Sequence, residues 1–283
     1  MSRETRKAKY FGDGASAEGE CPATCRRNEL LPPGIERLTE EALCAERLMP
    51  SDGSLLGAQD GEAAQVAVFD FDGTCLNGSS PKKLVDFLIK RYMLSVYKMF
   101  RVGLWGLAYK LNLPKDPNGV RKRVFSAFKG VPAINVNDFM CRFYHERIAQ
   151  MYRSDADACM IAHLEAGHAV VLISATFEPI IASAMVEHPI PIAMATRMKI
   201  GEDGCYTGEI DGLPTEGDDK IIVLRKFLNE YYGEGNWSLG WAYADHYSDV
   251  TLLQEAEHPC AVTPDPKLRR HAEKRGWDIL EWS

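Results

Sequence analysis

Two acidic clusters stand directly after apolar runs of the kind that form buried strands. An Asp-Phe-Asp-Gly-Thr segment at 70–74 follows the apolar run 66–69. Asp245 follows the run 239–244, and Asp249 lies four residues further along the chain. Carboxylate oxygens are ligands that Mg²⁺ prefers in proteins, and an aspartate can also carry a phosphoryl group as an acyl phosphate. The clusters therefore indicate phosphoryl chemistry around a divalent cation.

The residues at 70–74 suit successive steps of such a reaction. We expect Asp70, at the tip of its strand, to be the nucleophile. Asp72 can protonate the departing alcohol as a general acid and then deprotonate the attacking water as a general base. Gly73 allows a sharp turn, so that the backbone around Gly73 and Thr74 can contact the phosphate.

The remaining candidate residues would hold the phosphate and the metal. Ser174 and Ala175 follow the apolar run 170–173 and offer a hydroxyl and a backbone amide to the phosphoryl oxygens. Lys220 opens an amphipathic stretch and would offset the charge between Asp70 and the phosphate. Asp245 would be a second side-chain ligand of the metal. Asp249 would hold the waters of the metal or orient Lys220, although an N-cap of the following helix is an equal alternative.

Alternating strands and helices must bring these residues together. From residue 168 onward, short apolar runs alternate with helical stretches, which predicts an α/β fold with a parallel sheet covered by helices on both faces. The carboxyl ends of parallel strands share one edge of the sheet, where ligands bind. We assign 63–78 plus 167–283 to this core, 79–166 to an all-helical cap inserted after the first strand, and 1–62 to a disordered tail.

The order of these motifs is similar to that of a known enzyme family. The segments at 70–74 and 174–176, Lys220 and the Asp-x-x-x-Asp pair at 245–249 resemble the four motifs of the haloacid dehalogenase superfamily of phosphatases. The inserted helices resemble its helical-cap subclass, which includes phosphoserine phosphatases and phosphatidylglycerophosphatase-like hydrolases. Over residues 65–281 the resemblance implies a Rossmann-like core, a phosphoaspartate intermediate, and Mg²⁺ held by Asp70, the backbone carbonyl of Asp72 and Asp245.

One position departs from the phosphoserine phosphatases. They carry a glutamate shortly after the first motif, which binds the amino group of the substrate. The matching position in this chain is Ser79. Phosphoserine is therefore not favoured as the substrate.

Charge is distributed unevenly along the chain. The net charge is −7, which disfavours a general nucleic-acid partner, but residues 79–130 contain twelve basic and only two acidic residues. An apolar stretch within them, 92–113, is interrupted by basic residues, so it suits a helix in a membrane interface or one packed within the cap rather than a spanning helix. The substrate would then be a phospholipid or a phosphorylated small molecule.

These observations predict a Mg²⁺-dependent phosphomonoester hydrolase. Two alternatives remain: a phosphotransferase that uses the same aspartyl phosphate, and a membrane-binding protein with a vestigial site. The eight cysteines lack the spacing of a zinc site, and no apolar leader follows the first methionine. We therefore expect a protein of the cytoplasm, either free or peripheral to the membrane.

Overall fold

The computed structural model describes residues 63–90, 124–213 and 215–283. Seven strands are formed by these residues: β1 (Ala64–Asp70), β2 (Ala169–Phe177), β3 (Ile192–Ile200), β4 (Tyr206–Asp211), β5 (Trp237–Ala244), β6 (His258–Val262) and β7 (Asp278–Leu280). The α-helices are α2 (Ser80–Lys90), α5 (Ala133–Arg147), α6 (Ser154–Glu165), α7 (Glu178–Glu187), α8 (Asp219–Tyr232), α9 (Val250–Glu255) and α10 (Pro266–Arg275). Two short 3₁₀ helices, η3 (Ala149–Met151) and η4 (Tyr247–Asp249), complete the described elements.

The strands form one sheet in the order β4-β3-β2-β1-β5-β6-β7, and every neighbouring pair except β3–β4 is parallel. The chain runs from β1 to β2 and β3 on one side and later to β5 and β6 on the other. The direction of winding therefore reverses between β1 and β5. In open α/β sheets, ligands bind beyond the carboxyl ends of the strands at this switch point. Asp70 and Asp245 end or follow the two strands that flank it.

Alternation along β1 explains why both faces of the sheet are covered. Val66 and Val68 pack in one apolar cluster with α8, α9 and α10, whereas Ala67 and Phe69 pack in the other with α6 and α7. Successive side chains of a strand point to opposite faces, so a strand buried on both sides is a continuous apolar run. Asp70 lies an even number of positions after Val66 and Val68, so its side chain is on the same face of the sheet, the one that α8 covers. The predicted α/β fold with helices on both faces is confirmed.

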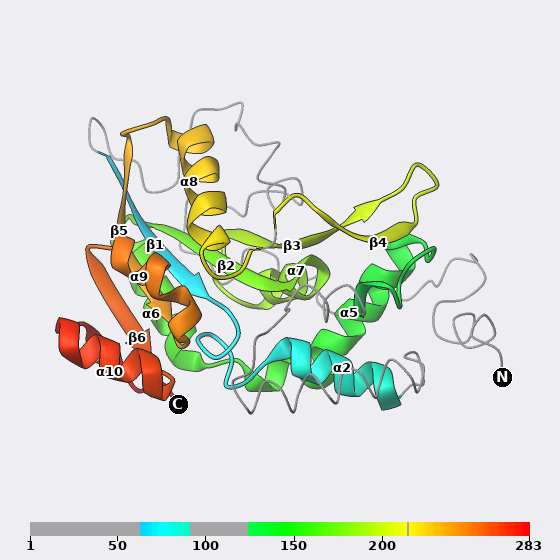
Figure 1. The fold of residues 1–283 in the computed structure, drawn as a ribbon, viewed down its shortest axis with the longest axis horizontal. Coiled ribbons are helices and arrows are strands. Elements are labelled where there is room, and N and C mark those ends of the chain that lie inside the picture. Colours follow the sequence, from blue (N-terminus) through cyan, green and yellow to red (C-terminus); the bar gives the residue numbers. More distant parts are fainter. Residues whose placement is uncertain (1–62, 91–123, 214) are drawn as a thin grey trace.

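Helices α2 and α5 lie beyond the carboxyl end of β1 and contact each other (Figure 1). Phe87 of α2 packs edge-on against Phe139 and Phe143 of α5, with ring centroids 5.5 and 5.0 Å apart. All three helices share one apolar cluster with the sheet, but only α6, through which Met160 and Leu164 join that cluster, also makes substantial direct contact with a strand, β2, among the described residues. The assignment of 79–166 to a cap stays a prediction, and this packing favours placing α6 with the core.

Several sequence predictions can be compared with the elements themselves. The apolar run 170–173 lies within β2, which extends to Phe177 because its pairing with β3 continues beyond a register shift after Ser174. Strands β3 and β4 form an antiparallel pair. No helix among the described residues is long and apolar enough to cross a membrane. The predicted tail at 1–62 and the apolar stretch 92–113 lie outside the described residues.

Candidate active site

A buried lysine joins two aspartates that are far apart in the sequence. The ammonium of Lys220, in the first turn of α8, donates hydrogen bonds to Asp70 Oδ1 at 2.5 Å and to Asp249 Oδ2 at 2.9 Å. All three side chains are at most 8% exposed. Since Asp70 belongs to the face of the sheet that α8 covers, the first turn of α8 is well placed to reach it. The structure thus brings together three of the residues that the sequence nominated.

Asp249 stands at the N-cap position of α9, but its carboxylate makes no capping hydrogen bond there. It binds Lys220 instead. Of the roles that the sequence left open, which were binding of the metal's waters, orientation of Lys220 and an N-cap, orientation of Lys220 agrees with the geometry.

Burial is the largest influence on the pKa values of the aspartates in this cluster. Burial raises the pKa of Asp70, and Asp249 raises it further, although Lys220 opposes both. Burial also raises the pKa of Asp245, and the charges of Asp70 and Asp249 add to that effect. The pKa of Lys220 is raised as well, because Asp249 and Asp70 outweigh the opposite effect of its burial. Two buried carboxylates, those of Asp70 and Asp249, share the single ammonium of Lys220, so an additional cation at this site would be stabilised.

The donor set suits a hard divalent cation such as Mg²⁺. Gly73 has a φ of +89°, and a Cβ at this position would lie 2.0 Å from Asp245 Oδ2. The backbone of the 70–74 turn therefore lies directly against the Asp245 carboxylate, and only glycine allows this approach. Carboxylate and carbonyl oxygens are the ligands that Mg²⁺ takes in proteins. Asp70, the Asp72 carbonyl and Asp245 could supply them.

The predicted phosphate-binding residues lie at the end of β2 and in the turn after β1. Ser174 is buried, and its Oγ accepts a hydrogen bond from the backbone N–H of Thr176 at 3.1 Å, so the hydroxyl proton stays free to be donated. Thr215 donates from its hydroxyl to the Ser174 carbonyl, which fixes the peptide unit that carries the Ala175 N–H. The Thr74 hydroxyl is buried and has no hydrogen-bond partner among the described residues.

Two residues that sequence reasoning missed hold the side chain of Asp72. The backbone N–H of Ser80 donates to Asp72 Oδ1 at 2.5 Å, and the hydroxyls of Ser80 and Thr176 donate to Oδ2 at 3.1 and 2.5 Å. Burial raises the pKa of Asp72, while these hydrogen bonds oppose the shift. Thr176 belongs to the quoted Ser-Ala-Thr segment, but only the packing of β2 against the start of α2 reveals its contact.

Other titratable residues near the site have local partners. The thiol of Cys75 is buried and donates to the Asp70 carbonyl at 3.1 Å, which agrees with a packing role. Burial, together with the charge of Asp70, raises the pKa of this thiol. The ring of His246 contacts Ser248 Oγ at 2.8 Å and lies 3.4 Å from Asp265 Oδ2. These contacts give His246 a local structural role.

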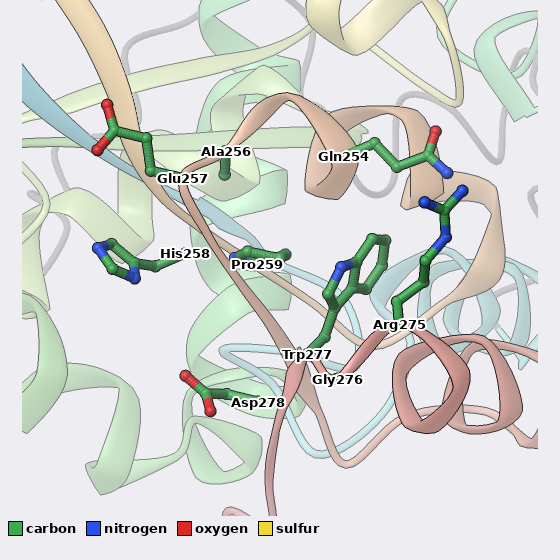
Figure 2. A pocket seen from close by; sticks show the side chains of 9 residues that line it. All are labelled: Gln254, Ala256, Glu257, His258, Pro259, Arg275, Gly276, Trp277 and Asp278. Atoms are coloured by element: carbon green, nitrogen blue, oxygen red, sulfur yellow. The ribbon is translucent and has the colours of Figure 1, made fainter.

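A separate pocket of ≈ 560 Å³ lies at the opposite end of the sheet. It is lined by residues at the amino ends of β6 and β7, including His258, Trp277 and Asp278 (Figure 2). Since the strands are parallel, this pocket is remote from Asp70 and Asp245. It takes no part in the site described above.

Comparisons with known proteins agree with this geometry. The family model of haloacid dehalogenase-like hydrolases matches residues 67–254. A histidinol-phosphatase of Neisseria meningitidis is 28% identical over 230 residues, which cover 77% of this chain and 98% of that protein. A phosphoserine phosphatase of Mycobacterium tuberculosis is 27% identical over 220 residues, which cover 76% of this chain and 70% of that protein.

Solved structures show the same fold. A protein of unknown function from Bordetella pertussis Tohama I superimposes with a TM-score of 0.68 at 23% identity, over 77% of this chain and 98% of that chain. A phosphoserine phosphatase solved as a phospho-aspartyl intermediate analogue gives a TM-score of 0.52 at 20% identity, over 76% of this chain and 92% of that chain. The chain belongs to the haloacid dehalogenase-like hydrolases and is a phosphatase of that family.

Proposed function

We propose that this protein is a Mg²⁺-dependent phosphomonoester hydrolase that acts on a small phosphorylated alcohol through a phosphoaspartate at Asp70. The observation that carries the proposal is the contact of Lys220 with Asp70 at 2.5 Å, because it joins a strand-end carboxylate to a fixed positive charge. Such a charge lowers the repulsion between an anionic nucleophile and a phosphate dianion.

The mechanism follows from the residues around this contact. Asp70 attacks phosphorus with a carboxylate oxygen, and the bond from phosphorus to the substrate oxygen breaks. Asp72 gives a proton to the departing alcohol and then takes one from the water that cleaves the acyl phosphate. The second step releases inorganic phosphate and restores the Asp70 carboxylate.

The phosphate-binding groups act by holding negative charge. The Ser174 hydroxyl and the Ala175 N–H would donate to the non-bridging oxygens, with the backbone around Gly73 and Thr74 on the other side. Mg²⁺ would be held by Asp70, the Asp72 carbonyl and Asp245, and its charge would neutralise part of the phosphate charge when bound. Asp249 would keep Lys220 in place.

The names of two relatives support a small phosphorylated molecule as the substrate. By their names, one of these relatives acts on a phosphate of histidinol and the other on phosphoserine, and both compounds are small phosphomonoesters. Ser79 stands where phosphoserine phosphatases carry a glutamate, so we favour an ester other than phosphoserine and place histidinol phosphate first. The basic character of 79–130 suggested a phospholipid, but most of those residues lie outside the described part of the chain.

A substrate panel tests the proposal. Purified protein with Mg²⁺ should release phosphate from p-nitrophenyl phosphate and from one member of a panel of histidinol phosphate, phosphoserine and short-chain phosphatidylglycerophosphate. The Asp70→Asn variant should fold and be inactive. Activity in that variant would exclude Asp70 as the nucleophile.

Two further outcomes would redirect the proposal. Transfer of phosphate to an added alcohol in place of water would identify a phosphotransferase. Binding to anionic vesicles without turnover of any phosphate ester would favour a membrane-binding protein with a vestigial site.

A further inference from the structure

The carboxylate of Asp72 is held on two sides by residues to which the proposed mechanism gives no role. We propose that Ser80 and Thr176 are positioning residues for Asp72, and that they aim its carboxylate for proton transfer to the leaving group. This inference rests on the proposed function, because it assumes that Asp72 is the general acid and base. Ser80, at the start of α2, and Thr176, near the end of β2, would then affect proton transfer specifically.

The contacts form a closed triangle. Thr176 Oγ1 lies 2.5 Å from Asp72 Oδ2, Ser80 Oγ lies 3.1 Å from the same oxygen, and the two hydroxyl oxygens are 2.7 Å apart. Each hydroxyl has one proton to donate. Thr176 donates to Asp72 Oδ2 over the shorter distance, and the Ser80 proton is shared between Asp72 Oδ2 and Thr176 Oγ1.

Backbone geometry fixes the other carboxylate oxygen. Ser80 is the first residue of α2, and its N–H has no acceptor within the helix, as for all first-turn amides. Asp72 Oδ1 accepts this N–H at 2.5 Å. Both oxygens of the carboxylate are therefore held, one by α2 and one chiefly by β2.

Burial makes this arrangement stiff. Ser80 is 0% and Thr176 is 2% exposed, so neither hydroxyl can exchange its partner for bulk water. Asp72 itself is half-buried, so part of its side chain stays accessible. A carboxylate whose two oxygens are held by hydrogen bonds and which stays partly accessible suits directed proton transfer, since this transfer requires hydrogen-bond distance to the leaving oxygen.

The inference makes a prediction that depends on the leaving group. When the Asp70–phosphorus bond forms and the ester bond breaks, the proton of Asp72 passes to the leaving oxygen. A p-nitrophenolate departs without that proton, whereas a phenolate or an alkoxide needs it. Misplacing Asp72 should therefore slow poor leaving groups more than good ones, whereas a merely structural defect should slow both equally.

The experiment compares kcat/KM for p-nitrophenyl phosphate and phenyl phosphate with Mg²⁺ present. In Thr176→Val we expect the phenyl ester to lose about tenfold more than the nitrophenyl ester, within the range of general acid catalysis. Thr176→Ser should restore the wild-type ratio because it keeps the hydroxyl. Ser80→Ala should change the ratio less than Thr176→Val, because the Ser80 N–H remains.

A matched control and one further variant separate the outcomes. Ser183 is another buried serine, and its hydroxyl donates to the Pro179 carbonyl within α7, so Ser183→Ala should leave the ratio unchanged.

Equal losses on both esters in Thr176→Val and Ser80→Ala would overturn the inference. If Asp72→Asn also lowered both esters equally, the assignment of Asp72 as the acid would fail with it. A selective loss in Asp72→Asn alone would leave the proposed function standing without the inference. If Thr176→Val does not fold, Ser80→Ala decides.

Discussion

Lys220 Nζ lies 2.5 Å from Asp70 Oδ1, although the two residues are 150 positions apart in the sequence. Both side chains are nearly inaccessible to water. A charge in such surroundings has to be paired, because an isolated buried charge is far more costly than an exposed one. The pair therefore links catalysis to stability: the group that serves the nucleophile also holds α8 against β1.

Removal of Lys220 should show this link. Lys220→Met leaves Asp70 and Asp249 buried without their cation, so we expect the free energy of unfolding to fall by about 3–5 kcal/mol. Phosphatase activity should be lost as well. Urea denaturation measures the first effect. Lys226→Met, at an exposed position of the same helix, should change the free energy of unfolding little. An equally stable Lys220→Met protein would contradict the account of the pair.

Substitution of Gly73 should act on the metal. The Cβ of Gly73→Ala would lie 2.0 Å from Asp245 Oδ2, so the Asp245 carboxylate has to move. We expect the Mg²⁺ concentration needed for half-maximal activity to rise by about tenfold or more, as for other changes that displace metal ligands.

Gly276→Ala is the matched control for this experiment. Gly276 has a φ of +71°, similar to that of Gly73, but an added Cβ meets nothing within 4 Å. Its substitution should cost stability through backbone strain and leave the Mg²⁺ dependence of activity unchanged. The same rise in Mg²⁺ requirement in both variants would show that strain, not contact with Asp245, is the cause.

A buried histidine should contribute to instability in acid. Burial, with a smaller contribution from His168, lowers the pKa of His163 to about 4, and its ring contacts Tyr243 Oη at 2.8 Å. In the unfolded chain a histidine has a pKa of about 6.5, so unfolding takes up a proton between these two pH values. The contribution of neutral His163 to stability is thus complete above pH ~6.5 and is lost as the pH falls toward 4.

The measurement is the pH dependence of the free energy of unfolding between pH 7 and pH 4. His163→Gln should reduce the proton uptake on unfolding by about one proton at most in this range. His258→Gln, at an exposed position, serves as the control. An unchanged pH dependence in His163→Gln would show that the folded and unfolded proteins protonate this ring at the same pH, which contradicts the lowered pKa.

The candidate residues at the strand ends could be nominated from the sequence because buried strands are recognisable as apolar runs. Asp70, Ser174 and Asp245 each follow or end an apolar run, and parallel strands bring their carboxyl ends to one edge. Lys220 could be nominated from its place in the order of the motifs. Its contact with Asp249 favours orientation of Lys220 over an N-cap as the role of Asp249.

The residues that were missed depend on contacts between distant elements. Ser80 and Thr176 are 96 positions apart and meet only because α2 begins beside the end of β2. A threonine in a strand and a serine at a helix start have ordinary structural roles, so neither pattern marks a functional residue. The packing of α6 on the sheet was hidden in the same way, since a helical period shows an apolar face but not its partner.

The most direct test of the account is the position of the covalent phosphoryl group. In Asp72→Asn, cleavage of the acyl phosphate should be slowed, so the intermediate should accumulate during turnover of p-nitrophenyl phosphate. Reduction of the acid-quenched protein with borohydride converts an aspartyl phosphate to homoserine, which peptide mass spectrometry locates. The account predicts homoserine at position 70 alone. Homoserine at another aspartate would contradict it, as would turnover that leaves Asp70 unmodified.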